Sequence, residues 1–130
     1  MNARHADWLS TAKSDLEFAE VGLAKKFPVQ TCFLSQQAVE KALKGVLVFL
    51  KRPYPKTHSL LELSRLVPEL DLKPHRLNLT ILDGYYAPLR YPDALPKGGP
   101  LDTVGAKEAK EAVALARIVY NLASALTSQP

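Results

Sequence analysis

The stretch from Pro28 to Lys51 constrains the fold of this chain more than any other, because it is long, apolar and periodic in helical steps. Its apolar residues form an arc that is too wide for a helix covered on one side only. Proline is well suited to the first turn of a helix, so Pro28 marks where the segment begins. We therefore expect a central helix that contacts several neighbours. The apolar positions are Cys32, Ala38, Val39, Ala42, Leu43, Val46, Phe49 and Leu50.

Four further segments show helical patterns, and none of the chain shows the alternation typical of strands. The first has apolar residues at helical spacing from Trp8 to Leu23 and ends at the turn KKFP. The others are a short helix from the cap at Ser59 to about residue 67, one over about residues 74–87, and a last one capped by Asp102 or Thr103. The pattern predicts an all-α fold, a five-helix, largely antiparallel up-and-down bundle, as a single domain over residues 1–130.

Composition places the chain among ordinary globular proteins. Its 130 residues are 47% hydrophobic and 23% charged, and the net charge of +4 favours an anionic partner only weakly. Cys32 is the single cysteine, at an apolar helical position where a buried small residue is expected rather than a nucleophile. The start of the chain does not resemble a signal peptide, and the apolar run GVLVFL is too short to span a bilayer. We expect a cytoplasmic protein with no membrane partner.

One face of the expected central helix is polar. Gln37, Glu40, Lys41 and Lys44 are spaced at i, i+3, i+4 and i+7, opposite the apolar arc. On one interpretation this face is solvated and carries a Glu40–Lys44 pair at i, i+4. On the other, the wide apolar arc implies that the polar face is partly enclosed, where its groups need partners. The sequence leaves both interpretations open.

The motif KTHSL places His58 directly before the capping residue of the third helix. Ser59 followed by Glu62 has the spacing of a capping box, so these residues are typical of a helix start. A helix N-terminus also attracts anions, and a histidine beside it is suited to contact a phosphate. Capping is the interpretation that we favour for Thr57, His58 and Ser59.

The long proline- and glycine-rich loop PLRYPDALPKGGPLD follows the fourth helix, and long loops in compact domains are often functional. Around its start lie Tyr85, Tyr86, Arg90, Tyr91 and Asp93. An arginine among tyrosines is suited to stack on bases and to grip phosphates with its planar fork. The alternative is that Arg90 pairs with Asp93 or with a backbone carbonyl and only braces the loop.

Taken together, QQAVEKALKG, KTHSL and LDGYYAPLRYPD, in this order across a helical chain, resemble the HEPN domain family. The name stands for higher eukaryotes and prokaryotes nucleotide-binding. The resemblance covers nearly the whole chain and implies a helical bundle that is commonly a homodimer. It also implies a partner, since small prokaryotic members are often encoded beside a minimal nucleotidyltransferase. In such pairs the HEPN protein is typically a toxin or a nucleotide-binding companion.

Many members of this family are metal-independent ribonucleases that use an Arg-x(4–6)-His motif late in the domain. This sequence departs from that pattern, because no histidine follows Arg90. Arg52 and His58 have the spacing, but they lie in the segment after the central helix. The candidate catalytic residues are thus His58, Arg90 and Arg52, and we predict neither a cofactor nor a metal site.

The sequence therefore predicts a nucleotide- or RNA-binding protein that acts with a nucleotidyltransferase in a toxin–antitoxin-type pair. Two alternatives stay open at this point: a metal-independent RNase toxin that uses an Arg/His pair, and a non-catalytic helical adaptor. The predicted ligand-binding residues are Gln37, Glu40, Lys41, Lys44, His58, Tyr86, Arg90, Tyr91 and Asp93.

Overall fold

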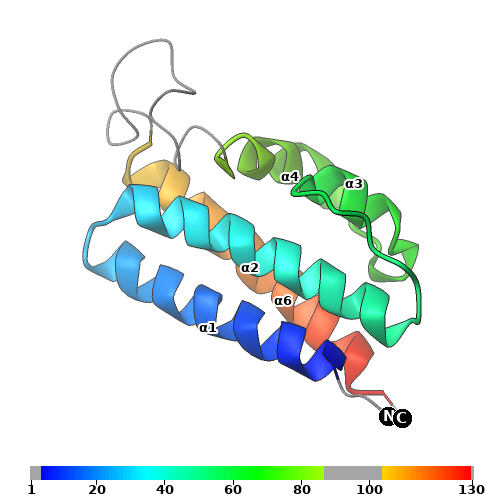
Figure 1. Ribbon diagram of the computed structural model, residues 1–130. Helices are drawn as coiled ribbons and strands as arrows, with labels where there is room; N and C mark the ends of the chain where they lie inside the picture. The colour runs from blue at the N-terminus through cyan, green and yellow to red at the C-terminus, as the bar shows by residue number, and fades with distance from the viewer. Residues whose placement is uncertain (1–3, 87–103, 130) are drawn as a thin grey trace.

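The computed structural model describes residues 4–86 and 104–129 of the chain, and all regular elements in these two ranges are helical (Figure 1). Three long helices lie side by side: α1 (Arg4–Ala24), α2 (Pro28–Phe49) and α6 (Ala106–Thr127). The shorter α3 (Leu60–Arg65) and α4 (Arg76–Asp83) cover one side of this layer. This arrangement confirms the predicted all-α fold. In the described ranges, no helix combines the length and the apolar character that crossing a membrane requires.

Helix α2 is the centre of the bundle and contacts α1, α6, α3 and α4. The apolar arc predicted from the sequence is buried along most of its length, and only Phe49 and Leu50 at its end are partly exposed. Pro28 occupies the first turn of the helix, as expected. A helix covered on several sides has little room for solvated polar groups, so its polar residues need partners within the protein.

Two glycines bring α1 and α2 close together. A Cβ atom on Gly22 would lie 2.5 Å from Thr31 Oγ1, and one on Gly45 would lie 3.0 Å from Trp8 Cβ and closer still to the side chain of Leu9. A side chain at either position would force a neighbouring side chain to shift, so glycine allows the close approach. The turn between the two helices contains Lys26 with a φ of 66°, in the left-handed region.

Helix α3 begins at the predicted cap. Ser59 Oγ accepts a hydrogen bond of 3.1 Å from the backbone N–H of Glu62. The Asp83 carboxylate, at the end of α4, accepts two further bonds from the same helix start, from Leu60 N at 2.6 Å and Leu61 N at 3.2 Å. The free N–H groups of this helix start are therefore occupied by protein side chains.

Two predicted boundaries need correction. The fourth helix begins at Arg76 rather than Pro74, because the preceding residues form two single 3₁₀ turns, η1 (Pro68–Leu70) and η2 (Lys73–His75). The last helix is not capped by Asp102 or Thr103, which lie outside the described residues. Its N-cap is Gly105, whose backbone N–H donates to Glu108 Oε1 at 2.8 Å.

Candidate functional site

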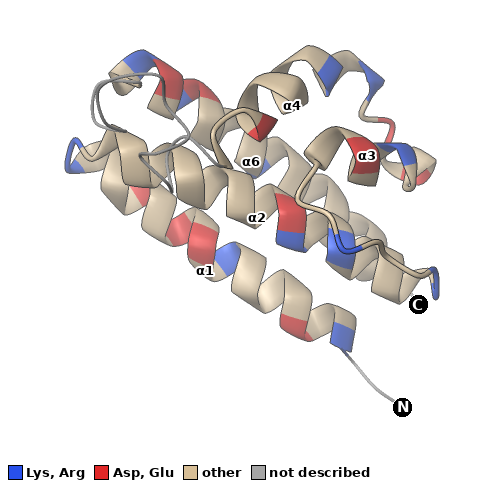
Figure 2. Cartoon of the chain, turned by 45° about the horizontal axis from the view of Figure 1, so that its top comes forward, with Lys and Arg blue, Asp and Glu red and all other residues tan. Residues whose placement is uncertain are grey.

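The polar face of α2 is enclosed. Glu40 is 6% exposed, Lys44 is 8% exposed, and Gln36 has no exposed surface. Figure 2 shows acidic and basic positions next to each other near the middle of this helix. Charged groups at this level of burial are costly unless they are paired and hydrogen-bonded. Of the two interpretations left open by the sequence, the structure favours the enclosed face.

The carboxylate of Glu40 is the hub of this face. It accepts hydrogen bonds from Lys44 Nζ at 2.9 Å, from Gln36 Nε2 at 3.3 Å and from His58 Nδ1 at 3.1 Å. Gln37 Nε2 extends the network by donating to Gln36 Oε1 at 2.7 Å. Three donors from two segments of the chain thus satisfy one buried carboxylate. We call Gln36, Glu40, Lys44 and His58 the Glu40 cluster.

His58 is the member of the Glu40 cluster that reaches the surface, with 57% of its side chain exposed. Its backbone carbonyl accepts a hydrogen bond from Gln36 Nε2 at 3.2 Å, which fixes the segment at this point. A carboxylate can only accept, so the Nδ1 that faces Glu40 carries a hydrogen. In the neutral ring, Nε2 is then an acceptor on the side turned away from Glu40.

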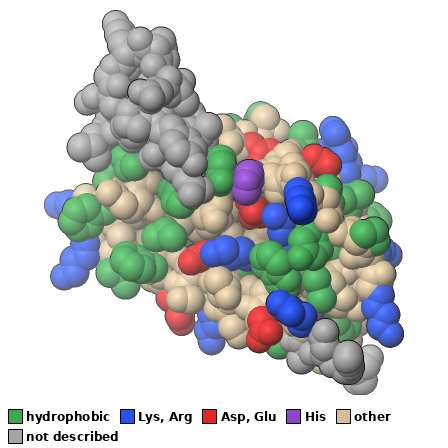
Figure 3. Space-filling model, in the orientation of Figure 1, with side chains coloured by type: hydrophobic (Ala, Val, Ile, Leu, Met, Phe, Trp, Pro, Cys, Tyr) green, Lys and Arg blue, Asp and Glu red, His purple; other side chains and the backbone are tan. Residues whose placement is uncertain are grey.

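Tyr86 forms a wall beside His58. The two rings are stacked, with centroids 4.2 Å apart and an interplanar angle of 15°, and the Tyr86 hydroxyl oxygen lies 3.2 Å from His58 Nε2. Phe33 packs against the Tyr86 ring as well, with centroids 5.9 Å apart. Figure 3 shows a histidine on this side of the molecule, with basic and acidic side chains and a hydrophobic area next to it.

The other predicted residues either pair elsewhere in the fold or lie outside the described residues. Lys41 lies outside the Glu40 cluster and pairs with Asp15 of α1 at 2.6 Å. Arg52 donates to Glu69 with both terminal nitrogens and to the carbonyl of Leu66 at 3.2 Å. Arg52 and His58 therefore have no common partner in the described part of the chain. Arg90, Tyr91 and Asp93 lie outside the described residues.

Comparisons with known proteins agree on one family. The sequence matches the HEPN domain over residues 5–126. The chain belongs to the HEPN domain family. The protein TT1696 from Thermus thermophilus has a crystal structure with a TM-score of 0.85 and 35% identity, over 96% of this chain and 98% of that one. The archaeal HEPN homologue ST0689 gives a TM-score of 0.80 and 32% identity, over 98% and 100%. No curated protein matches the sequence significantly.

The helix start at Ser59 of this HEPN domain has the structure of a cap. Asp83 holds two of its N–H groups, and its Oδ2 lies 3.4 Å from Ser59 Oγ. A bound phosphate at the same N–H groups would have to displace a carboxylate. The helix start therefore positions His58, and the imidazole rather than the backbone is the group available to a ligand.

Cys32 is fully buried and Tyr85 is partly buried against the core. Burial raises the pKa of the Cys32 thiol to about 12, with a smaller contribution from the charge of Glu108. Burial likewise raises the pKa of Tyr85 to about 12. Both groups are therefore protonated at neutral pH, which agrees with the prediction that Cys32 is a buried small residue. In the two described ranges, no three His, Cys, Asp or Glu side chains are grouped so as to hold a metal ion.

Sequence reasoning missed three residues of this region. Gln36 lies four residues before Glu40, so the same helical spacing that selected Lys44 was a signal for it. Asp83 caps a helix that begins more than twenty residues earlier in the chain, and no local pattern connects the two. The spacing of Trp8 indicates only a core position, yet Lys44 Nζ lies 6.0 Å from the centroid of its ring.

Proposed function

We propose that this HEPN protein binds a nucleotide or RNA, and that His58 contacts a phosphate of the ligand. One observation carries the proposal: Glu40 engages His58 Nδ1, so that Nε2 lies on the exposed side of the ring, where the Tyr86 hydroxyl is 3.2 Å away. Glu40 is itself buried and already has three donors, so it acts as a support for the imidazole. Such a histidine can donate a hydrogen bond to an anion through Nε2 when it is protonated.

The two lysines closest to the candidate site are each paired with a carboxylate, so few groups remain to attract a phosphate. Lys44 is neutralised by Glu40 and Lys41 by Asp15, so neither lysine adds much net field at the surface. Arg90 therefore keeps its importance in the proposal as the second phosphate contact. Tyr91 and Asp93 remain proposed ligand-binding residues, and the ring of Tyr86 stacks on the imidazole.

Binding of a fluorescently labelled RNA, followed by anisotropy, tests the role of His58. We expect His58→Ala to weaken binding by roughly tenfold or more, which is the size of a hydrogen bond to a charged group. His75→Ala is the matched control, because it removes another histidine that lies at the start of α4. Equal affinities for both variants would exclude His58 from the site. Binding should also weaken as salt rises, because phosphate contacts release counterions.

Arg90→Lys tests the second contact. If Arg90 grips a phosphate, lysine keeps the charge but loses the planar fork, and affinity should fall by roughly tenfold. If Arg90 only braces the loop, the variant should melt at a lower temperature and bind normally per folded molecule. Affinity and melting temperature, measured on the same preparation, separate the two outcomes.

A metal-independent ribonuclease is the second candidate, and the pairing of Glu40 with His58 favours it. A carboxylate that fixes the imidazole tautomer makes Nε2 the acceptor of the ring, and an attacking hydroxyl would take the place of the Tyr86 hydroxyl there to give up its proton. RNA cleavage in the presence of a chelator, abolished in His58→Ala, would establish the ribonuclease. Binding without cleavage supports the main proposal, and the absence of both leaves the non-catalytic adaptor.

We also propose that the protein acts in the cytoplasm as a homodimer, and with a minimal nucleotidyltransferase in a toxin–antitoxin-type pair. An exposed apolar patch at the turn between α1 and α2 supports the dimer. Its side chains line a groove of about 310 Å³. Phe18, Val21 and Phe27 are 64%, 55% and 56% exposed there. Light scattering on the wild type and on Phe18→Lys checks this: we expect a dimer that the substitution dissociates. A wild-type monomer at tens of micromolar would refute it.

A further inference from the structure

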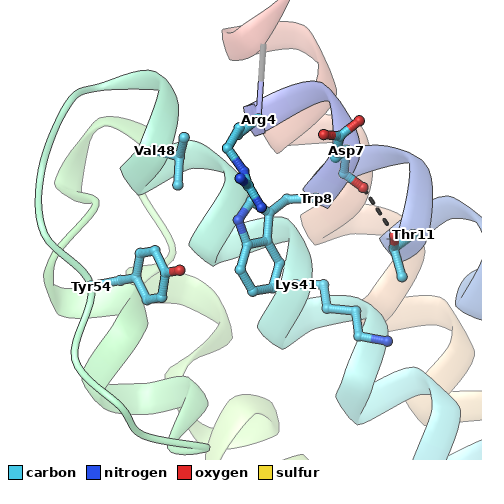
Figure 4. A pocket seen from close by; sticks show the side chains of 7 residues that line it. All are labelled: Arg4, Asp7, Trp8, Thr11, Lys41, Val48 and Tyr54. Atoms are coloured by element: carbon cyan, nitrogen blue, oxygen red, sulfur yellow. Dashed lines mark hydrogen bonds between the residues drawn. The ribbon is translucent and has the colours of Figure 1, made fainter. Parts of the chain in front are cut away.

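A separate pocket lies next to the Glu40 cluster, between the first half of α1, the second half of α2 and the segment that follows α2 (Figure 4). Its volume is about 580 Å³, within the range of pockets that hold small organic ligands. Two aromatic rings, two cations and two polar side chains form most of its lining. These residues are Trp8 and Tyr54, Arg4 and Lys41, and Asp7 and Thr11.

The two aromatic rings of the pocket form a corner. Trp8 and Tyr54 are in edge-to-face contact, with centroids 5.5 Å apart and an interplanar angle of 78°. A flat ligand can stack on the face of one ring while its edge meets the other. Tyr54 is 40% exposed, although it packs against Trp8. Aromatic surface at the wall of a pocket suits a planar heterocycle.

The polar groups of the pocket complement a nucleotide. The guanidinium of Arg4 suits a phosphate, and the carboxylate of Asp7 can accept from an amino or a hydroxyl group. Lys41 also lines the pocket, but its Nζ is paired with Asp15. Thr11 donates its hydroxyl hydrogen to the carbonyl of Asp7 at 2.9 Å, so its oxygen is available as an acceptor. A ligand that has a planar ring and polar groups at its edge matches this mixed lining better than a purely apolar ligand does.

Lys44 connects the pocket to the Glu40 cluster. Its Nζ lies 6.0 Å from the ring centroid of Trp8 and 5.9 Å from that of Tyr54, and 2.9 Å from Glu40 Oε2. Glu40 in turn contacts His58. The Lys44–Glu40 ion pair thus lies between the Trp8–Tyr54 corner on one side and the imidazole of His58 on the other.

We infer that this pocket holds an unpaired base of a single-stranded RNA, stacked in the Trp8–Tyr54 corner, while a neighbouring phosphate contacts His58. The inference rests on the proposed function and adds the class of RNA. A base inside a duplex has both faces covered by its neighbours and cannot stack on a protein ring. Single-stranded chains expose their bases, and stacking on aromatic side chains binds them with little dependence on sequence.

The chain provides its own reporter for this inference, because Trp8 is the only tryptophan. A short single-stranded oligoadenylate should quench the Trp8 fluorescence in a saturable way. The same oligonucleotide annealed to its complement should not, and neither should inorganic phosphate. Quenching by the duplex at equal concentration would overturn the inference, as would quenching by phosphate alone.

Tyr54→Ala tests the corner directly. Loss of one stacking ring should weaken binding of the single strand by roughly tenfold. Leu77→Ala is the control, since it removes an apolar side chain of α4 that is 73% exposed and lies outside both this pocket and the proposed dimer surface. An unchanged affinity in Tyr54→Ala, with the variant folded by circular dichroism, would overturn the inference.

The same measurements separate this inference from the proposed function. If labelled RNA binds and depends on His58, but Trp8 is not quenched and Tyr54→Ala binds normally, the pocket is refuted and the His58 site stands. If the single strand quenches Trp8 equally in the wild type and in His58→Ala, the pocket stands and the His58 site is refuted. Absence of any RNA binding by the wild type would refute both.

Discussion

Two ion pairs flank the segment between α2 and α3, and they differ chiefly in burial. The Lys44–Glu40 pair has side chains that are 10% and 8% exposed, whereas those of Arg52 and Glu69 are 40% and 34% exposed. The buried pair is completed by hydrogen bonds from Gln36 and His58, because an incompletely satisfied charge would be costly there. The exposed pair has no such requirement, since water can solvate either partner.

The difference in burial between the two ion pairs goes with a difference in role. In the Glu40 cluster, the buried charges hold His58 in place and leave its outer nitrogen at the surface. In the exposed pair, both terminal nitrogens of Arg52 bond to Glu69, which fixes the start of the segment. The buried pair therefore positions a candidate functional group, and the exposed pair uses its own group as a brace.

Removing Glu40 should produce the largest effect on stability. Glu40→Ala leaves Lys44 buried next to Trp8 and Tyr54 without its carboxylate partner. We expect a loss of about 3 kcal/mol or more in the free energy of unfolding, because breaking one side of a buried ion pair strands the other charge. Urea denaturation followed by circular dichroism measures it.

Lys44→Met is the matched control for Glu40→Ala. Methionine fills a similar volume without a charge, and Glu40 keeps the donors Gln36 and His58. We expect a clearly smaller loss of stability than in Glu40→Ala. Equal losses in the two variants would show that packing rather than the stranded charge determines the cost.

Asp83→Ala should have an intermediate effect. Its carboxylate holds the N–H groups of Leu60 and Leu61, and thereby fixes α3 next to His58. Loss of such a cap typically costs about 1–2 kcal/mol. Asp83→Asn keeps an acceptor oxygen and should recover part of the loss, which the same denaturation assay would detect. A neutral Asp83→Ala would mean that Ser59 alone caps this helix.

The sequence was sufficient for the fold because the relevant signals are local. Pro28 at the start of α2, the apolar arc behind it and the cap at Ser59 all follow from residues within a few turns of one another. The 3₁₀ turns before α4 were missed, since Pro74 is compatible with the first turn of either kind of helix. Helical spacing also indicated the Glu40–Lys44 pair, but as part of the interpretation in which this face is solvated, whereas the pair is buried.

The candidate site was only partly predictable because its contacts join distant segments. Helical spacing brought Glu40 and Lys44 together, but contact with His58 depends on how the segment after α2 folds back. The same fold directs Arg52 to Glu69, which no spacing rule reveals. Trp8 and Tyr54 belong to different elements, and their corner exists only because α1 packs against α2 near Gly45.

The smallest effect should come from Arg52→Ala, and its dependence on pH and salt makes it informative. The side-chain hydrogen bond from Arg52 holds the pKa of Glu69 below its ordinary value. A carboxyl group with a lowered pKa in the folded state adds stability above its unfolded pKa, and this contribution disappears as the pH falls through the folded value. The melting temperature of Arg52→Ala should thus lie slightly below that of the wild type at neutral pH and equal it in acid. At about 1 M salt, where the screening length is about 3 Å, the difference should also shrink.

Glu69→Gln removes the other partner of the same ion pair. It should melt at about the same temperature as Arg52→Ala at neutral pH, and the difference in melting temperature between the two variants should not grow in acid. A loss as large as that from Glu40→Ala, or one that is insensitive to both pH and salt, would show that burial does not distinguish the two pairs.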